Sequence, residues 1–136
     1  MDKKPVRVRI SEANLSKANY NFDHHDQNDS YQISFEDIVV ASNFTNDSFE
    51  LVYTRKSTTK EPFQFVVEFI VKVNDVNTND LEANQEQIKD FAERKKIDIV
   101  NKLILPARAS LLISNITRES SGAFVTIPTY FEAKKN

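Results

Sequence analysis

The repeat of apolar residues changes near Asp80 from a period of two to a period close to four, and this change constrains the fold most strongly. Before it, residues 63–74 alternate along a strand, and the apolar face consists of Phe63, Phe65, Val67, Phe69, Val71 and Val73. After it, apolar residues recur mostly four apart between residues 84 and 117, at Ile88, Ala92, Ile99, Leu103, Ala107 and Leu111. The sequence therefore predicts an α+β chain in which the strands precede the helices.

Three further strands are predicted before this change. The first covers residues 6–10, and residues 19–30 form a polar surface loop. The second covers residues 31–44, where the apolar parity changes near Glu36-Asp37, so we expect a bulge there. The third covers residues 49–54. Because short connections join antiparallel neighbours, we predict a four-stranded antiparallel meander.

A long kinked helix and a short C-terminal segment are predicted to follow the sheet. Asp80 is the expected N-cap of a helix that starts near Leu81. Pro106 must start, break or kink this helical stretch, because proline lacks the backbone N–H that the helix interior needs. Gly122 fits the C-cap, and residues 123–131 are expected to return across the sheet. A chain of 136 residues fits one domain, residues 1–136.

Residues 97–116 are apolar on nearly every side, whereas a surface helix on one sheet needs a single apolar stripe. A second covering surface is therefore required, and another copy of the chain would supply it. We expect at least a dimer. The candidate interface residues are Leu105, Leu112, Ile113 and Ile116.

Composition excludes several classes of function. The chain has no Cys, so disulfides, thiolate metal sites and a cysteine nucleophile are excluded. A single Gly excludes glycine-rich phosphate loops. A pI near 5.7 argues against general nucleic-acid binding. No targeting segment or membrane-spanning stretch is visible, so we expect a cytoplasmic protein without a membrane or nucleic-acid partner.

Two polar clusters are candidate sites. Asp23-His24-His25-Asp26 holds metal-capable side chains, but adjacent residues on one polar loop rarely converge on a metal, so we expect no metal site or cofactor. Glu36-Asp37 and Glu68 could face one another and act as acid and base. Charged residues on the polar face of a strand are usually only solvated. We therefore expect no catalytic residues and no enzyme activity.

The chain holds ten Phe and four Tyr, and most of these aromatic residues are expected in the core. Those at strand or loop ends are expected instead to rim apolar grooves, which accept extended segments by strand pairing and side-chain pockets. The candidate groove residues, expected to hold such a segment, are Phe44, Phe63, Phe65, Tyr130 and Phe131.

Two C-terminal stretches resemble the SecB family of protein-export chaperones. Residues 103–108 (Leu-Ile-Leu-Pro-Ala-Arg), followed by residues 113–117, are similar to the family's leucine-phenylalanine-proline-x-alanine-arginine helix and the apolar turn after it. Residues 127–133 resemble the family's proline-x-asparagine-phenylalanine-x-alanine close. Asn14-Leu15-Ser16 is a fainter echo of its aspartate-leucine-serine motif. The resemblance implies a SecB-like fold, a dimer of dimers, and grooves that hold unfolded polypeptide.

The chain departs from the family pattern where SecB docks on the SecA ATPase. The acidic residue of the first-strand motif is Asn14 here, Lys17 and Ala18 follow, and the tail ends in Lys134-Lys135-Asn136. Pro106 and Arg108 are also closer together than in the family. Losing the carboxylates removes the charge complementarity that steers such an encounter, so we expect weak or absent SecA docking.

Together with the SecB resemblance, the sequence predicts an ATP-independent holdase chaperone that binds non-native polypeptide in apolar grooves, and the resemblance extends this expectation to protein export. One alternative is a dedicated SecB-like chaperone for a single partner, such as an antitoxin or a phage protein. An alternative of another class is a small-ligand-binding α+β protein or enzyme.

Overall fold

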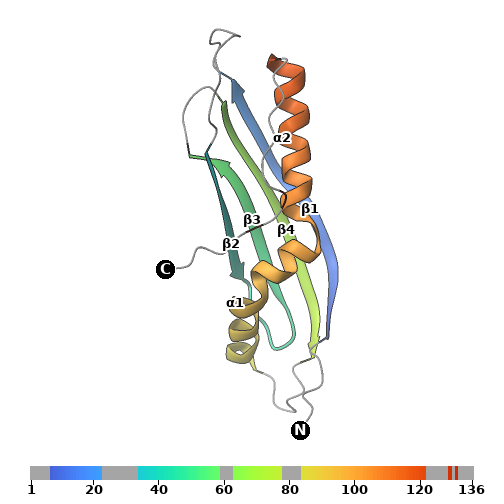
Figure 1. Ribbon diagram of the computed structural model, residues 1–136. Coiled ribbons are helices and arrows are strands. Elements are labelled where there is room, and N and C mark those ends of the chain that lie inside the picture. Colours follow the sequence, from blue (N-terminus) through green and yellow to red (C-terminus); the bar gives the residue numbers. More distant parts are fainter. Residues whose placement is uncertain are drawn as a thin grey trace.

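The computed structural model describes residues 7–22, 34–58, 63–77, 84–121, Thr129 and Phe131. Four strands precede two helices: β1 (Arg7–Phe22), β2 (Phe35–Ser42), β3 (Phe49–Ser57), β4 (Phe63–Asn77), α1 (Gln85–Lys102) and α2 (Leu105–Ser121). Both helices lie across the same face of one sheet (Figure 1). This arrangement confirms the predicted fold class, a four-stranded antiparallel sheet followed by helix.

The strand order is β1-β4-β3-β2, and every pairing is antiparallel. Strands β2, β3 and β4 form the predicted meander, but β1 pairs with β4 and not with β2, which gives a Greek-key arrangement. The reason lies in strand length, since β1 has 16 residues, β4 has 15 and β2 has only eight. Pairing the two long strands satisfies more backbone hydrogen-bonding groups.

Strand β1 is much longer than the predicted strand over residues 6–10, and it takes in part of the predicted loop. Its register against β4 shifts between Arg7 and Arg9, between Ile10 and Glu12, and between Leu15 and Lys17. Each shift moves the following side chains to the other face, so the alternation that marks a strand is lost from the sequence.

Strand β2 is regular, and the bulge predicted near Glu36-Asp37 is wrong. Its register with β3 runs without a break from Phe35↔Ser57 to Ser42↔Glu50. The apolar parity changes because Asp37 occupies an inner-face position between Phe35 and Val39. A carboxylate on the buried face was therefore mistaken for a change in strand geometry.

The inner face of the sheet forms the core together with one side of each helix. Helix α1 contacts β2 and β3, and α2 contacts β1, β3 and β4. The Phe49 and Phe91 rings meet edge to face at 6.2 Å, and the Tyr53 and Phe69 rings stack at 6.5 Å. The most deeply buried apolar residues, each at most 1% exposed, are Phe49, Leu51, Tyr53, Val67, Val71, Val73, Ile88, Ala92, Val100, Leu105, Ala109 and Ile113.

The helical stretch starts and breaks for local reasons. The N-cap of α1 is Asn84, not Asp80: the Asn84 side chain accepts from the Gln87 backbone at 3.0 Å, and the Gln87 side chain accepts from the Asn84 backbone at 3.2 Å. The predicted break falls where Ile104 adopts a φ of 53° and Pro106 enters the first turn of α2. Within the described part of the chain, neither helix has the length and apolarity needed to cross a bilayer.

The burial pattern predicts unequal costs for two truncations on neighbouring strands. Leu51→Ala removes a side chain with no exposed surface and should lower the free energy of unfolding by about 2–5 kcal/mol. Val40→Ala, at a side chain that is 52% exposed, should cost within about 0.5 kcal/mol as the matched control. Urea unfolding checks both. Equal costs for the two variants would contradict the assignment of the inner face.

Candidate functional site

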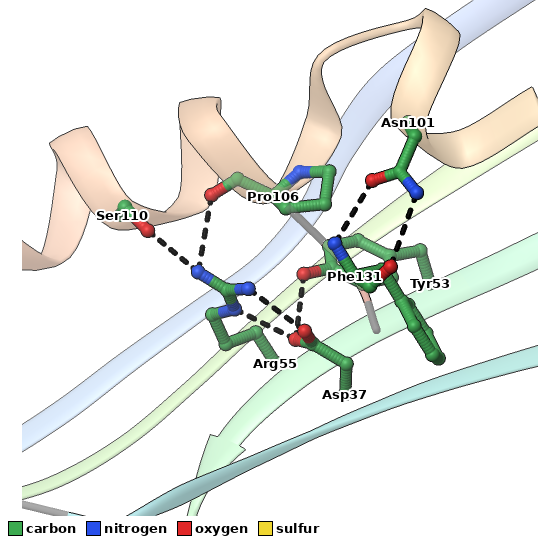
Figure 2. A network of polar contacts seen from close by, with 7 residues as sticks. All are labelled: Asp37, Tyr53, Arg55, Asn101, Pro106, Ser110 and Phe131. Carbon is green, nitrogen blue, oxygen red and sulfur yellow. Dashed lines mark hydrogen bonds and ion pairs between the residues drawn. The ribbon is translucent and has the colours of Figure 1, made fainter. Parts of the chain in front are cut away.

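A buried ion pair crosses from β2 to β3 beneath α2 (Figure 2). The Arg55 Nε donates to Asp37 Oδ1 at 2.6 Å, and Arg55 Nη2 donates to Asp37 Oδ2 at 2.7 Å. The Arg55 side chain has no exposed surface, and that of Asp37 is 8% exposed. Two parallel hydrogen bonds from a planar guanidinium are the strongest form of this interaction.

The same guanidinium holds the second helix to the sheet. Arg55 Nη1 donates to the Ser110 hydroxyl at 2.5 Å and to the Pro106 carbonyl at 3.3 Å, and both acceptors belong to α2. The Arg55 guanidinium also lies 4.6 Å from the centre of the Phe35 ring. One side chain therefore joins the edge strand β2, the central strand β3 and the first turns of α2.

Tyr53 belongs to this network through its hydroxyl, which donates to Asp37 Oδ1 at 2.7 Å. Burial, and after it the hydrogen bond to Asp37, raises the pKa of Tyr53 well above its ordinary value. The phenol therefore stays a neutral donor at physiological pH, and its ring is fixed on the inner face beside Phe69.

Close to Tyr53, the Asn101 side chain holds the main chain of Phe131. Asn101 Nδ2 donates to the Phe131 carbonyl at 3.1 Å, and the Phe131 N–H donates to Asn101 Oδ1 at 2.9 Å (Figure 2). The Phe131 ring lies 6.0 Å from the Tyr53 ring. A residue far along the chain is thus seated on the inner face between the end of α1 and strand β3.

The three candidate groove residues whose side chains the structure describes, Phe44, Phe65 and Phe131, do not form one site. Phe44 is half-buried, and its carbonyl accepts from Gln85 Nε2 at 2.6 Å, beyond the end of β2. Phe65 is 3% exposed and lies at the opposite end of the sheet, where its N–H donates to Ser57. Phe131 is half-buried. The Phe63 side chain and Tyr130 lie outside the described residues.

Phe65 borders a cavity of about 320 Å³ at the end of the sheet where β1, β4 and β3 lie side by side. The lining mixes amides, hydroxyls and one lysine with three apolar or aromatic side chains. Its residues are Asn19, Tyr20, Asn21, Lys56, Ser57, Thr58, Gln64, Phe65 and Val66.

Two of the four candidate interface residues are buried within the single chain. Leu105 has no exposed surface and Ile113 is 1% exposed, because both pack against the sheet. Leu112 and Ile116 are half-buried. The sequence pattern could not tell the sheet-facing side of α2 from its outer side.

The aliphatic side chains that are most exposed in this part of the chain are not among the four candidate interface residues. Ile104 is 60% exposed, and Leu111 is 63% exposed on α2. Between them Arg108 lies 4.8 Å from the centre of the Phe69 ring and donates to the Ala13 carbonyl at 3.4 Å. Leu15, which pairs with Phe69 across the sheet, is 46% exposed. Residues 104, 108 and 111 are four and then three apart, and this helical spacing is the sequence signal that could have grouped Ile104 with Leu111.

The predicted carboxylates do not converge, because Asp37 lies on the inner face while Glu36 and Glu68, on the outer face, each have another partner. Glu36 pairs with Lys56 at 3.3 Å, and Glu68 accepts from the Ser16 hydroxyl at 2.8 Å, whereas Asp37 is on the inner face. In the described ranges no three His, Cys, Asp or Glu residues could hold a metal. The cluster at residues 23–26 lies outside those ranges.

Substitutions of the two members of the buried pair should have strongly non-additive effects on the free energy of unfolding. Arg55→Met leaves Asp37 buried without its partner and should lower the free energy of unfolding by about 3–5 kcal/mol, while Arg55→Met with Asp37→Leu should cost much less than the two single changes together. Urea unfolding of the four proteins measures the coupling.

The neighbouring Glu36–Lys56 pair is the matched control, because it joins the same two strands with side chains 34% and 42% exposed. Its double-mutant coupling should be below about 1 kcal/mol. A coupling of the same size in both pairs would contradict the role given to Asp37 and Arg55.

Comparison with known proteins reveals similarity in structure and none in sequence. No protein-family model and no curated protein matches the sequence. Among solved structures, the Mycobacterium tuberculosis Rv1957 SecB-like chaperone, in complex with a ChAD peptide from the Rv1956 HigA1 antitoxin, aligns with a TM-score of 0.61 at 10% identity. The alignment covers 90% of this chain and 91% of that one.

A protein of unknown function from Streptococcus agalactiae aligns more weakly, with a TM-score of 0.39 at 14% identity, over 92% of this chain and 99% of the other. The likeness to Rv1957 covers both layers, since the sheet and the two helices make up most of the chain. The chain therefore has the fold of the SecB-like chaperones.

Proposed function

We propose that this protein is an ATP-independent chaperone that holds apolar segments of non-native polypeptides and keeps them soluble. The observation that carries the proposal is the large aliphatic side chains left exposed on a folded, well-packed chain. They are Leu15, Ile38, Val40, Ile104 and Leu111, at 36–63% exposure.

These residues belong to two regions of the fold. Leu15 lies on β1, Ile104 in the break directly before α2, and Leu111 on α2. Ile38 and Val40 lie on the outer face of the sheet, where the register places Val40 beside Val52. Grouped exposed aliphatic residues mark surfaces that protein partners cover, and each covered Å² contributes about 25 cal/mol before ordering costs.

The fold supports the same function. Rv1957, whose fold this chain shares, is a SecB-like chaperone bound to an antitoxin peptide. That complex also favours a second candidate, a dedicated chaperone for one partner protein. The polar cluster at Asp37, Tyr53 and Arg55 does not support a catalytic role, because these side chains are buried and bond to one another. Weak docking to SecA stays a prediction.

We also propose that copies of this chain associate through Leu15, Ile104 and Leu111, which leaves Ile38 and Val40 exposed for clients. Covering these side chains would supply the second apolar surface that the sequence requires for residues 97–116. The dimer of dimers implied by the SecB resemblance would need this contact and one more. We place the protein in a reducing cytoplasm, because a chain without Cys fits that compartment.

Light scattering tests the holdase function. The protein without nucleotide should suppress the aggregation of several unrelated unfolded clients in proportion to its concentration, because binding buries client apolar surface. An equal mass of a non-chaperone protein is the control. Suppression of one client alone would favour the dedicated chaperone, and suppression of none would contradict both candidates.

Sedimentation tests the association. Leu111→Asp places a charge where the fold of the single chain leaves the side chain exposed, so the monomer should fold but the oligomer should dissociate at micromolar concentration. Asn115→Asp adds the same charge at an exposed position one turn further along α2 and should leave the oligomer intact. A monomeric wild type, or an oligomer unaffected by Leu111→Asp, would refute the proposed interface.

A further inference from the structure

The contacts of Phe131 are of a kind that many different residues could make. Its N–H and C=O both bond to the one amide of Asn101, at 2.9 and 3.1 Å. A side-chain amide that takes both groups of one residue acts as a neighbouring strand does, since it satisfies the main chain without reading the side chain.

The side chain attached to that main chain meets an aromatic surface that is already in place. The Phe131 ring lies 6.0 Å from the Tyr53 ring and is inclined to it by 48°. Tyr53 is fully buried, is stacked on Phe69, and is fixed by the bond from its hydroxyl to Asp37 (Figure 2). Rigid partners lose little entropy on binding, so this surface is preorganised for an apolar side chain.

We propose that Asn101 and Tyr53 form a binding site for one residue of an extended client segment with a large apolar side chain. Phe131 occupies the site in the free protein, and a client displaces it. The inference rests on the proposed function, because it names where and how a non-native chain is held.

The displacement follows from the chemistry of the contacts. Phe131 contributes two main-chain hydrogen bonds and one ring contact, and any Phe, Tyr or Leu in an extended client can supply the same. As a part of the same chain, Phe131 competes at the effective concentration of a tethered ligand. The site is thereby closed to weak, transient contacts and open to segments that bind elsewhere on the protein as well.

The probe is a fluorescein-labelled peptide of extended, alternating Phe and Ser residues, whose binding is followed by anisotropy. Phe131→Ala should tighten binding several-fold, because the competitor for the aromatic surface is lost. In that background, Asn101→Leu should weaken binding about tenfold through the loss of two hydrogen bonds. Asn101→Asp keeps an acceptor and loses the donor, so its affinity for the peptide should lie between those of Phe131→Ala alone and of Phe131→Ala with Asn101→Leu.

Asn115→Leu, made in the same Phe131→Ala background, is the matched control, since it makes the same exchange at an exposed amide of α2. Circular dichroism and urea unfolding identify any variant that fails to fold. If Asn101→Leu fails to fold, the milder Asn101→Asp variant still tests the role of the amide. Affinity should change little with salt, because the bonded groups are uncharged.

Three outcomes would overturn the inference. Wild-type binding that neither Asn101→Leu nor Phe131→Ala alters would place the client elsewhere and leave the proposed function standing. Weaker binding by Phe131→Ala would make Phe131 part of the client surface and not its stand-in. A wild type that neither binds the peptide nor suppresses aggregation would refute the proposed function as well.

Discussion

The buried pair of Asp37 and Arg55 is the interaction on which the rest of the structure depends. It connects the edge strand β2 to β3 by two short hydrogen bonds, and it connects both to α2 through Pro106 and Ser110. Taking two charges out of water costs several kcal/mol each, so such a pair stabilises a fold only when its hydrogen bonds are well satisfied. Its clearest consequence here is specificity, because it fixes the position of one helix on the sheet.

The position of Tyr53 follows from the same pair. Its hydroxyl is bound to Asp37, and its ring contacts the rings of Phe131 and Phe69. The neighbouring amide of Asn101 completes a surface that holds main chain and an apolar side chain together. A structural ion pair thus prepares the surface on which a client segment is proposed to lie.

The class of the fold could be predicted from the sequence because strand and helix leave different periods. Phe63 to Val73 alternate without interruption, and the break at Pro106 follows from its missing N–H. The strand order could not be predicted, because three register shifts in β1 remove its alternation and hide its pairing with β4. The inner-face position of Asp37 could not be predicted either, since pattern analysis assigns a carboxylate to the polar face of a strand.

The candidate site was the least predictable part. Aromatic residues were chosen by their place at strand ends, yet Phe65 is 3% exposed, and Phe44 lies at the other end of the sheet. Asn101 was missed because a single amide on a helix carries no signal until its partner is known, and that partner is 30 residues away. The apolar residues of α2 were recognised as a group, but which of them face outward depends on how the helix is rotated on the sheet.

The central claim is that the inner face holds a residue of another polypeptide where Phe131 now lies. Isotope-filtered nuclear Overhauser measurements on labelled protein with an unlabelled apolar peptide test it most directly. We expect contacts from the Asn101 amide protons and the Tyr53 ring to the peptide, together with loss of the contact between the Tyr53 and Phe131 rings. Peptide contacts confined to other surfaces, with the Tyr53–Phe131 contact unchanged, would contradict it.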